Sequence, residues 1–365
     1  MIAPLTGVRA FAALWVIFHH LRLSIELIAP SAEGLQHFLG FGYLGVDLFA
    51  FLSGFVIAYN YAERIARGTP REVGRYLWLR AVRIFPLHWF MLAVLALAVA
   101  VIPNFGTHPL DAGRYQATDF VQHALMVHGW GFAPHYAWDM PSWTVSAEWL
   151  CYLAFPLVAA ALLRIRDAAV AFACAGISVG ATAVVLRALG YPDFSASLWW
   201  GALRIAGEFL AGALLFRAWQ LGFARRAPWG VIAVAAFGAA VALTRWSGAA
   251  VAIVACFGIG VLALAHGRGP LCWLLARRPV VFLGEISYSI YLAHWVVLRI
   301  LENVRPDLLA GTPWARSRLG DLVICVGLIL AASVATYYGV ESPARRGLRR
   351  FAVPARSVGQ SREAV

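Results

Sequence analysis

The sequence predicts an all-α fold, a polytopic membrane helix bundle with about ten transmembrane helices and both termini in the cytoplasm. Of the 365 residues, 61% are hydrophobic and only 13% are charged. A soluble chain of this length needs more charge to cover its surface. The apolar residues also form runs of about 17 to 22 residues, which are long enough to cross ~30 Å of hydrocarbon.

The apolar runs divide the chain into ten expected spans. They lie near 5–28, 41–61, 84–104, 141–163, 168–189, 198–219, 228–244, 248–265, 281–301 and 319–340. We interpret the first span as a retained helix and not as a cleaved signal peptide. A long loop, 62–83, is expected on the cytoplasmic side, and another, 105–140, on the outer side. We expect one membrane domain, 1–346, and a short, basic, disordered cytoplasmic tail, 347–365.

The orientation follows from the arginines, because all thirty basic residues are Arg. Alternating the spans from a cytoplasmic start puts 20 arginines inside and 8 outside, with Arg9 and Arg204 within spans. This distribution obeys the positive-inside rule. The net charge of +12 would suggest nucleic acid in a soluble protein. Here the arginines flank membrane segments, so we expect no nucleic-acid partner.

Cysteine and histidine spacings predict no metal site. The five cysteines show no CxxC or CxxH spacing, so neither a zinc site nor a disulfide framework is expected. The outer loop holds four histidines whose spacing fits no usual zinc pattern: His108, His123, His128 and His135. With neighbouring Trp and Tyr residues they form either a platform for a sugar or an aromatic belt.

The first span, LTGVRAFAALWVIFHH, carries groups that lipid penalises. Arg9 and His20 are eleven residues apart, almost three whole turns, so they share a face about 16 Å apart along the axis. We expect them to face one interior cavity at two depths, because interior ionisable groups usually have a function. The alternatives are that Arg9 reaches to the inner interface and that His20 is a satisfied interior histidine.

Further charged residues lie in the second and sixth spans and in the loop between spans two and three. Asp47, in GYLGVDLFAFLSGFVIAYN, is either functional or a carboxylate at the outer interface. Arg80 and Arg83 lie one turn apart at the cytoplasmic side, which suits a phosphorylated ligand but equally suits membrane anchoring. Arg204 and Glu208 are four residues apart, and we interpret them as a structural pair that neutralises itself.

Two later spans carry aligned polar groups. Thr144, Glu148 and Tyr152 share one helical face, and a buried Glu148 needs an Arg or His partner. That partner is either functional or part of a structural ion pair. Tyr291 and His294 share a face of the ninth span, where the alternative is a set of interfacial aromatics around an interior histidine. The tenth span ends in YYGVESPARR, which predicts a helix stop at the Ser-Pro pair.

Together these motifs resemble the acyltransferase-3 family of integral membrane acyltransferases, from Leu5 to about Arg346. The family's Arg-then-His signature matches Arg9 and His20, and its glycine-rich helix matches GVDLFAFLSGF. Its basic-proline element matches RAVRIFPLHW, its Trp-Ser-Glu helix SWTVSAEWLCYLAFPL, and its late element ISYSIYLAH. Its closing Glu-x-Pro matches Glu341 and Pro343. Thr6, His88 and Ala293 depart from the usual family residues. We expect no appended extra-cytoplasmic hydrolase-like domain.

The resemblance implies an enzyme of the bacterial inner membrane that transfers an acyl group, most often acetyl, from cytoplasmic acyl-CoA to a saccharide hydroxyl. Acetyl-CoA would then be a substrate, with no permanently bound cofactor. The catalytic candidates are His20, as general base or transient acyl carrier, with Glu148 or Asp47 orienting a histidine, and Arg9. The candidate donor-binding residues are Arg9, Arg80 and Arg83. The candidate substrate contacts are Ser53, Ser142, Trp143, Tyr291 and His294.

Two other classes remain open from the residues alone. A transporter or flippase for a saccharide-lipid would also place His, Glu and Arg in the bundle interior. A non-catalytic scaffold for glycan assembly would tolerate replacement of His20 and Glu148. The sequence does not distinguish acetyl from longer acyl groups, direct transfer from an acyl-enzyme, or monomer from oligomer. O-antigen, exopolysaccharide, a signalling oligosaccharide and a macrolide are all acceptors in this family, and we favour an envelope polysaccharide.

Overall fold

The computed structural model describes residues 2–102, 105, 113–132, 135–197, 199–309 and 318–352, and it is helical without strands over these ranges. The helices that build the bundle are α1 (Ala3–His20), α4 (Gly45–Ala66), α5 (Pro70–Val101), α7 (Trp143–Leu162), α8 (Ala168–Ala188), α9 (Gly201–Gln220), α10 (Trp229–Leu243), α11 (Ala250–Ala265), α14 (Ser287–Leu309) and α15 (Arg318–Thr336). Shorter helices connect them: α2 (Arg22–Glu26), α3 (Glu33–Gly40), α6 (Ala117–Ala124), α12 (Pro270–Leu275), α13 (Arg278–Glu285) and α16 (Ser342–Arg349).

The all-α membrane bundle is confirmed. Five of the described helices are long and apolar enough to cross a membrane, and six if the bent pair α13–α14 counts as one span. α10 and α11 are apolar but shorter. The number of ten spans and the cytoplasmic position of both termini stay predictions.

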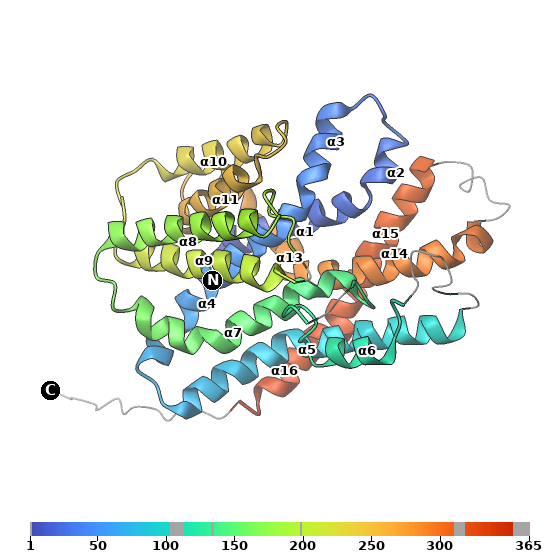
Figure 1. The fold of residues 1–365 in the computed structure, drawn as a ribbon, viewed down its shortest axis with the longest axis horizontal. Coiled ribbons are helices and arrows are strands. Elements are labelled where there is room, and N and C mark those ends of the chain that lie inside the picture. The colour runs from blue at the N-terminus through green and yellow to red at the C-terminus, as the bar shows by residue number, and fades with distance from the viewer. Residues whose placement is uncertain are drawn as a thin grey trace.

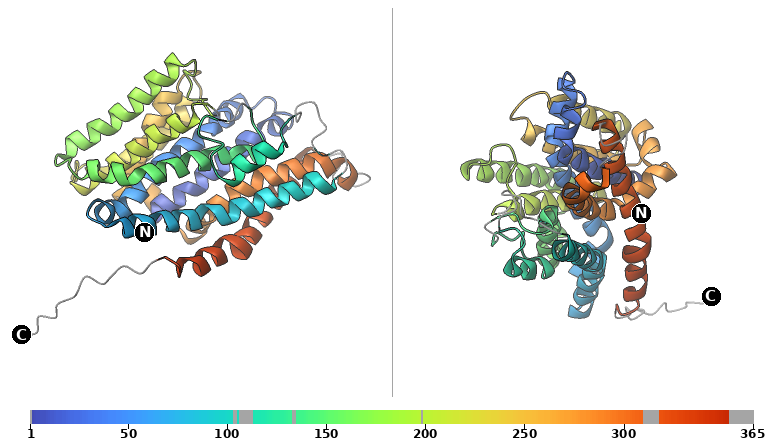
Figure 2. Two further views of the ribbon diagram at one scale, coloured as in Figure 1. Left: turned by 60° about the horizontal axis from the view of Figure 1, so that its bottom comes forward. Right: turned by 90° about the vertical axis from the view of Figure 1, so that its right-hand side faces the viewer.

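Helix α1 lies at the centre of the molecule. It packs against α4, α13 and α14, and α11 also touches it. Small side chains permit this, since Ala12 and Ala13 have no exposed surface. Around this centre, α8 pairs with α9 and α10 with α11 on one side, while α14 and α15 lie on the other (Figure 1). α5 runs beside α14 and contacts α16 (Figure 2).

Helices α4 and α9 make the closest pairing in the bundle, and glycines allow it. A Cβ at Gly54 would overlap the backbone oxygen of Phe209, and a Cβ at Gly212 would overlap the backbone oxygen of Phe51. Such small residues let two membrane helices approach backbone to backbone. The close pairing fixes the position of the polar residues on α4.

Three sequence-based predictions of local structure are wrong. The expected loop 62–83 is mostly helix, because α5 begins at Pro70, whose ring suits the first turn. The expected span 281–301 is broken between α13 and α14, which are bent by 60°. The helix does not stop at the Ser-Pro pair either. A stretch of π-helix (Tyr337–Glu341) leads from α15 into α16.

Candidate active site

Two adjacent cavities lie toward the end of the bundle where α1 begins. This end also carries Arg67, Gln220 and Arg345, and we call it the basic end. The inner cavity, of about 450 Å³, opens there. The central cavity, of about 60 Å³, lies deeper among α1, α4, α5, α7 and α14. Arg9 and Arg83 line both cavities. These two arginines therefore form the junction between the basic end and the middle of the bundle.

The Arg9 guanidinium lies where the inner and central cavities meet. Within the described residues its guanidinium makes no ion pair, and it faces the ring of Phe49 at 5.9 Å. Its Nε is buried without a hydrogen-bond partner. Glu148 lies on the wall of the same central cavity and is the nearest opposing charge to influence it. A partly buried cation that lines a cavity in this way is suited to an anionic or carbonyl-bearing ligand.

Arg83 is held in place by a carboxylate from the far end of the chain. Its Nη1 donates to Glu341, which is 1% exposed, and its guanidinium lies over the Tyr288 ring at 4.9 Å. Glu341 also accepts a hydrogen bond from Ser289 Oγ at 2.7 Å. The stretch of π-helix after α15 brings Glu341 to this position.

The second arginine of the expected phosphate-binding pair lies elsewhere. Arg80 donates to the Tyr61 hydroxyl at 2.9 Å and covers the Tyr61 ring at 5.1 Å. It does not line the inner or the central cavity. Of the expected donor-binding residues, the structure therefore brings Arg9 and Arg83 together and separates Arg80.

Hydrogen bonds join several other polar side chains of the central cavity. The Tyr152 hydroxyl donates to Glu148 Oε2 at 2.7 Å and lies 2.9 Å from Ser53 Oγ. At the other side of the cavity, the Tyr291 hydroxyl donates to the Pro141 carbonyl at 2.7 Å. It accepts from Thr144 Oγ1 at 2.8 Å. Glu148 is thus directed toward Tyr152 and the cavity, and no hydrogen bond joins it to a histidine among the described residues.

A row of rings leads from the central cavity to the opposite end of the bundle. The Tyr291 and His294 rings are 5.7 Å apart, and the His294 and His20 rings are 5.1 Å apart. His294 has no exposed surface. The Nδ1–H of His20 donates to the Val16 carbonyl at 2.9 Å. In a neutral ring this bond leaves Nε2 as a base with a free lone pair.

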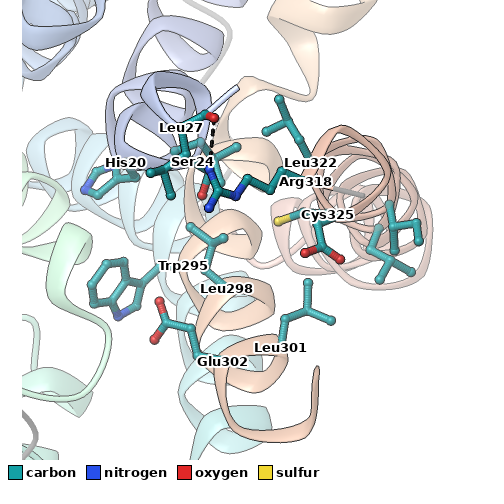
Figure 3. Close-up of a pocket in the computed structure, with 14 residues that line it drawn as sticks. His20, Ser24, Leu27, Trp295, Leu298, Leu301, Glu302, Arg318, Leu322 and Cys325 are labelled. Atoms are coloured by element: carbon teal, nitrogen blue, oxygen red, sulfur yellow. Dashed lines mark hydrogen bonds between the residues drawn. The ribbon is translucent and has the colours of Figure 1, made fainter. Parts of the chain in front are cut away.

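His20 lines a third cavity, the outer pocket, of about 430 Å³ between α1, α14 and α15. In Figure 3, His20, Trp295 and Glu302 lie on one side of the pocket, and Arg318 extends into it from α15 on the other side. Arg318 donates to the Leu27 carbonyl at 3.1 Å. Most other lining residues are leucines. Arg9 and His20 therefore face two different cavities, and the expectation of one shared cavity is wrong.

Asp47, the buried acid of α4, is bonded to Arg204 of α9. Arg204 Nε donates to Asp47 Oδ1 at 2.8 Å, and Nη2 donates to Oδ2. Both side chains are at most 2% exposed. No hydrogen bond joins Glu208 to Arg204 in the described ranges, so the expected pairing within α9 is wrong. Asp47 is also not available to orient His20, because both of its oxygens accept from Arg204.

Ser142 and Trp143 lie outside the three cavities. Ser142 Oγ donates to the Asp139 carbonyl at 2.6 Å and accepts from His128 Nε2 at 3.0 Å. The Trp143 ring faces the Arg204 guanidinium at 6.0 Å and touches the backbone at Gly201. The structure places both side chains in the support for the start of α7 and does not bring them to the ring row.

A buried polar cluster beside this support was missed from the sequence. The His88, His128 and His123 rings stack, with centroids 6.2 and 3.7 Å apart. Both carboxyl oxygens of Asp139 are buried without a hydrogen-bond partner among the described residues. Burial raises the pKa of Asp139 to about 8 and lowers the pKa of His123 to about 4. The only sequence signal was an acid directly before the MPSW segment.

Within the described residues, no group of three or more His, Cys, Asp or Glu side chains is arranged to hold a metal ion. His108 lies outside the described residues.

Comparison with known proteins decides the class. A family model for an acyltransferase domain matches residues 2–338. The chain belongs to the acyltransferase-3 family. The match includes all the residues of the ring row and all those that line the inner and central cavities except Arg345. The family membership makes the chain an acyltransferase enzyme of the membrane, and it separates the chain from the transporter and scaffold classes.

Several curated relatives align along nearly the whole chain. Acyltransferase MdmB from Streptomyces mycarofaciens is 27% identical over 95% of this chain and 92% of its own length. Putative peptidoglycan O-acetyltransferase YrhL from Bacillus subtilis is 24% identical over 96% of this chain and 56% of its own length. O-acetyltransferase OatA from Staphylococcus aureus is 21% identical over 98% of this chain and 59% of its own length. No solved structure gives a significant match.

Proposed function

We propose that this acyltransferase moves an acyl group, most simply acetyl, from cytoplasmic acyl-CoA to a saccharide hydroxyl on the outer side of the plasma membrane. The observation that carries the proposal is Arg9. It is a partly buried guanidinium with no ion pair among the described residues, and it lines both the inner and the central cavity. The names of YrhL and OatA support an O-acetyl transfer.

The donor would enter from the basic end. Its thioester carbonyl would lie next to Arg9 and Arg83, where a positive charge in a dry cavity stabilises the negative charge that develops on the carbonyl oxygen. Glu341 keeps Arg83 in this place. Glu148 lines the same cavity as the two arginines.

The acceptor would enter the outer pocket. The Trp295 ring lies 5.7 Å from the His20 ring and offers an apolar face for one side of a sugar. In the reaction, the acceptor hydroxyl meets the thioester carbonyl carbon along the ring row between the outer pocket and the central cavity. The hydroxyl oxygen attacks this carbon while His20 Nε2 takes the hydroxyl proton. The carbon–sulfur bond then breaks, and the proton is passed to the CoA thiolate. His294 lies between the two cavities, where it would line the path of the acyl group.

The test uses acetyl-labelled acetyl-CoA with membranes that contain wild-type protein or the His20→Ala variant and the native acceptor. We expect label in glycan and release of CoA in the wild type, and a loss of about 10²–10⁴-fold or more in the variant. His19→Ala is the matched control, because His19 is directed to the Leu39 carbonyl at 2.9 Å and lies outside the outer pocket. Near-normal transfer by His20→Ala in correctly folded protein would contradict the role of His20.

A further inference from the structure

A fourth cavity, of about 680 Å³, opens at the basic end between the last turns of α4 and α9 and the first turn of α5. We call it the side cavity. It lies outside the family's Arg-then-His and basic-proline motifs. Neither the ring row nor the expected phosphate-binding residues use it. Its walls combine aromatic rings, of which Tyr59 is exposed, with cations.

The aromatic wall consists of Tyr59, Phe216 and Trp219. Tyr59 lies 6.0 Å from Phe216 and 5.9 Å from Trp219 between ring centroids, and 41% of its surface is exposed. The Tyr59 ring is perpendicular to the Phe216 ring (89°) and tilted by 59° from the Trp219 ring, so Tyr59 and Trp219 form an angled apolar wall in front of the buried Phe216. Such surfaces bind planar heterocycles by stacking, and each stacked base contributes about 1–3 kcal/mol.

The charged wall carries Arg64 and Arg67, which line the cavity from the end of α4 and its C-cap. Both are exposed, and neither pairs with a carboxylate in the part of the chain that the structure describes. Two acids also line the cavity. Glu63 accepts a hydrogen bond from Gln220 Nε2 at 2.8 Å, and Glu72 lies beside Gly68. Two arginines next to an aromatic surface suit a phosphorylated ligand with a planar ring.

The side cavity borders the route to the catalytic centre. Tyr59 and Asn60 line both the side cavity and the inner cavity. The inner cavity in turn shares Arg9 and Arg83 with the central cavity. A ligand that fills this route has a bulky, planar, phosphorylated head at the surface and a narrow arm that ends in a reactive group beside Arg9.

We propose that the side cavity binds the phosphorylated adenosine end of the acyl donor, with the adenine on Tyr59 and Trp219 and phosphate groups on Arg64 and Arg67. This inference rests on the acyl-CoA donor proposed above. It places the contacts with the nucleotide on residues other than Arg80, because Arg80 faces Tyr61 and lines neither the side cavity nor the inner or central cavity. The arm that carries the thioester then passes Asn60 and reaches Arg9.

The kinetic test compares acetyl-CoA with acetyl-pantetheine, which lacks the nucleotide. For Trp219→Ala and for Arg64→Gln/Arg67→Gln we expect KM for acetyl-CoA to rise about tenfold or more. We expect kcat to be unchanged, because the nucleotide is remote from the reacting atoms. Acetyl-pantetheine should react equally with wild type and variants. Arg225→Gln/Arg226→Gln, exposed at the same end but outside the cavity, is the matched control and should behave as wild type.

A binding measurement separates this inference from the proposed function. Adenosine 3′,5′-bisphosphate should bind the purified wild-type protein in equilibrium dialysis, and Trp219→Ala and Arg64→Gln/Arg67→Gln should each weaken it about tenfold or more. Binding that depends on these residues supports the side cavity even if no acyl transfer is detected. The inference is overturned by equal affinity in wild type and variants. It is also overturned if the variants impair acetyl-pantetheine as much as acetyl-CoA.

Discussion

Asp47 and Arg204 form an ion pair that determines whether Asp47 can take part in the reaction. Their bidentate pair is buried between α4 and α9, and each charge lacks another described counter-charge at bonding distance. We therefore interpret the pair as structural. Removing one partner of a buried pair leaves the other charge unpaired, which costs about 3–5 kcal/mol.

This interpretation gives a stability prediction. Asp47→Asn and Arg204→Gln should each lower the thermal unfolding temperature of the purified protein. The double variant should be less destabilised than the sum of the two single variants, because no lone charge remains. Additive effects of the two substitutions would contradict a direct pair, and a loss of transfer at full stability would restore a catalytic role to Asp47.

Asp139 gives a prediction of pH dependence. Its pKa in the folded protein, about 8, lies above the ordinary value of 3.8, so the folded state binds a proton that the unfolded state has released. The stabilisation is therefore fully present below about pH 4 and is lost as the pH rises toward 8. His123 acts in the opposite direction, but only between about pH 4 and its ordinary value of 6.5.

The measurement compares thermal unfolding of wild type and Asp139→Asn at pH 6.5 and pH 8.5. The amide cannot ionise, so the variant should lose less stability than the wild type over this interval. Equal losses in the two proteins would show that Asp139 does not remain protonated in the folded state.

At the scale of the helices, the contact of α4 with α9 depends on Gly54. An added Cβ would overlap the Phe209 backbone oxygen, which cannot move without shifting the whole helix. Gly54→Ala should therefore separate the helices and reduce the yield of folded protein in detergent. Gly180→Ala in α8, where no atom lies within 4 Å of the added Cβ, is the control. A stable, monodisperse Gly54→Ala protein would contradict the close packing.

The helices also show how far the sequence could predict the structure. Hydropathy identified the all-α bundle, but it could not identify the first part of α5, because a charged helix outside the apolar run has no hydropathy signal. The bend before Ser287 was equally hidden. It depends on Gly284 lying against the Thr6 backbone, a contact between residues far apart in the chain.

The sequence could predict which residues belong to the candidate site better than it could predict how they are arranged. Arg9, His20, Glu148, Tyr291 and His294 were all proposed from motifs and helical faces, and the structure places them in or next to one row of cavities. The Asp47–Arg204 and Arg83–Glu341 pairs join residues 157 and 258 positions apart. Such pairings depend on helix packing, which local spacing does not reveal.

At the scale of the whole molecule, the cavities form a route from the basic end to the outer pocket. Inner and central cavities share two arginines, and the Tyr291–His294–His20 row continues to the pocket beside Trp295. Transfer along this route requires the donor and the acceptor to approach from opposite faces of the membrane. Only the acyl group would pass between the cavities.

The measurement that tests this claim most directly uses sealed vesicles in which the basic end of the protein faces one known side. Labelled acetyl-CoA and acceptor are added to the same side or to opposite sides. The account predicts labelled acceptor only when acetyl-CoA is on the side of the basic end and the acceptor is on the other side. His20→Ala vesicles should give no label in any arrangement. Transfer that requires both substrates on the same side would contradict the account.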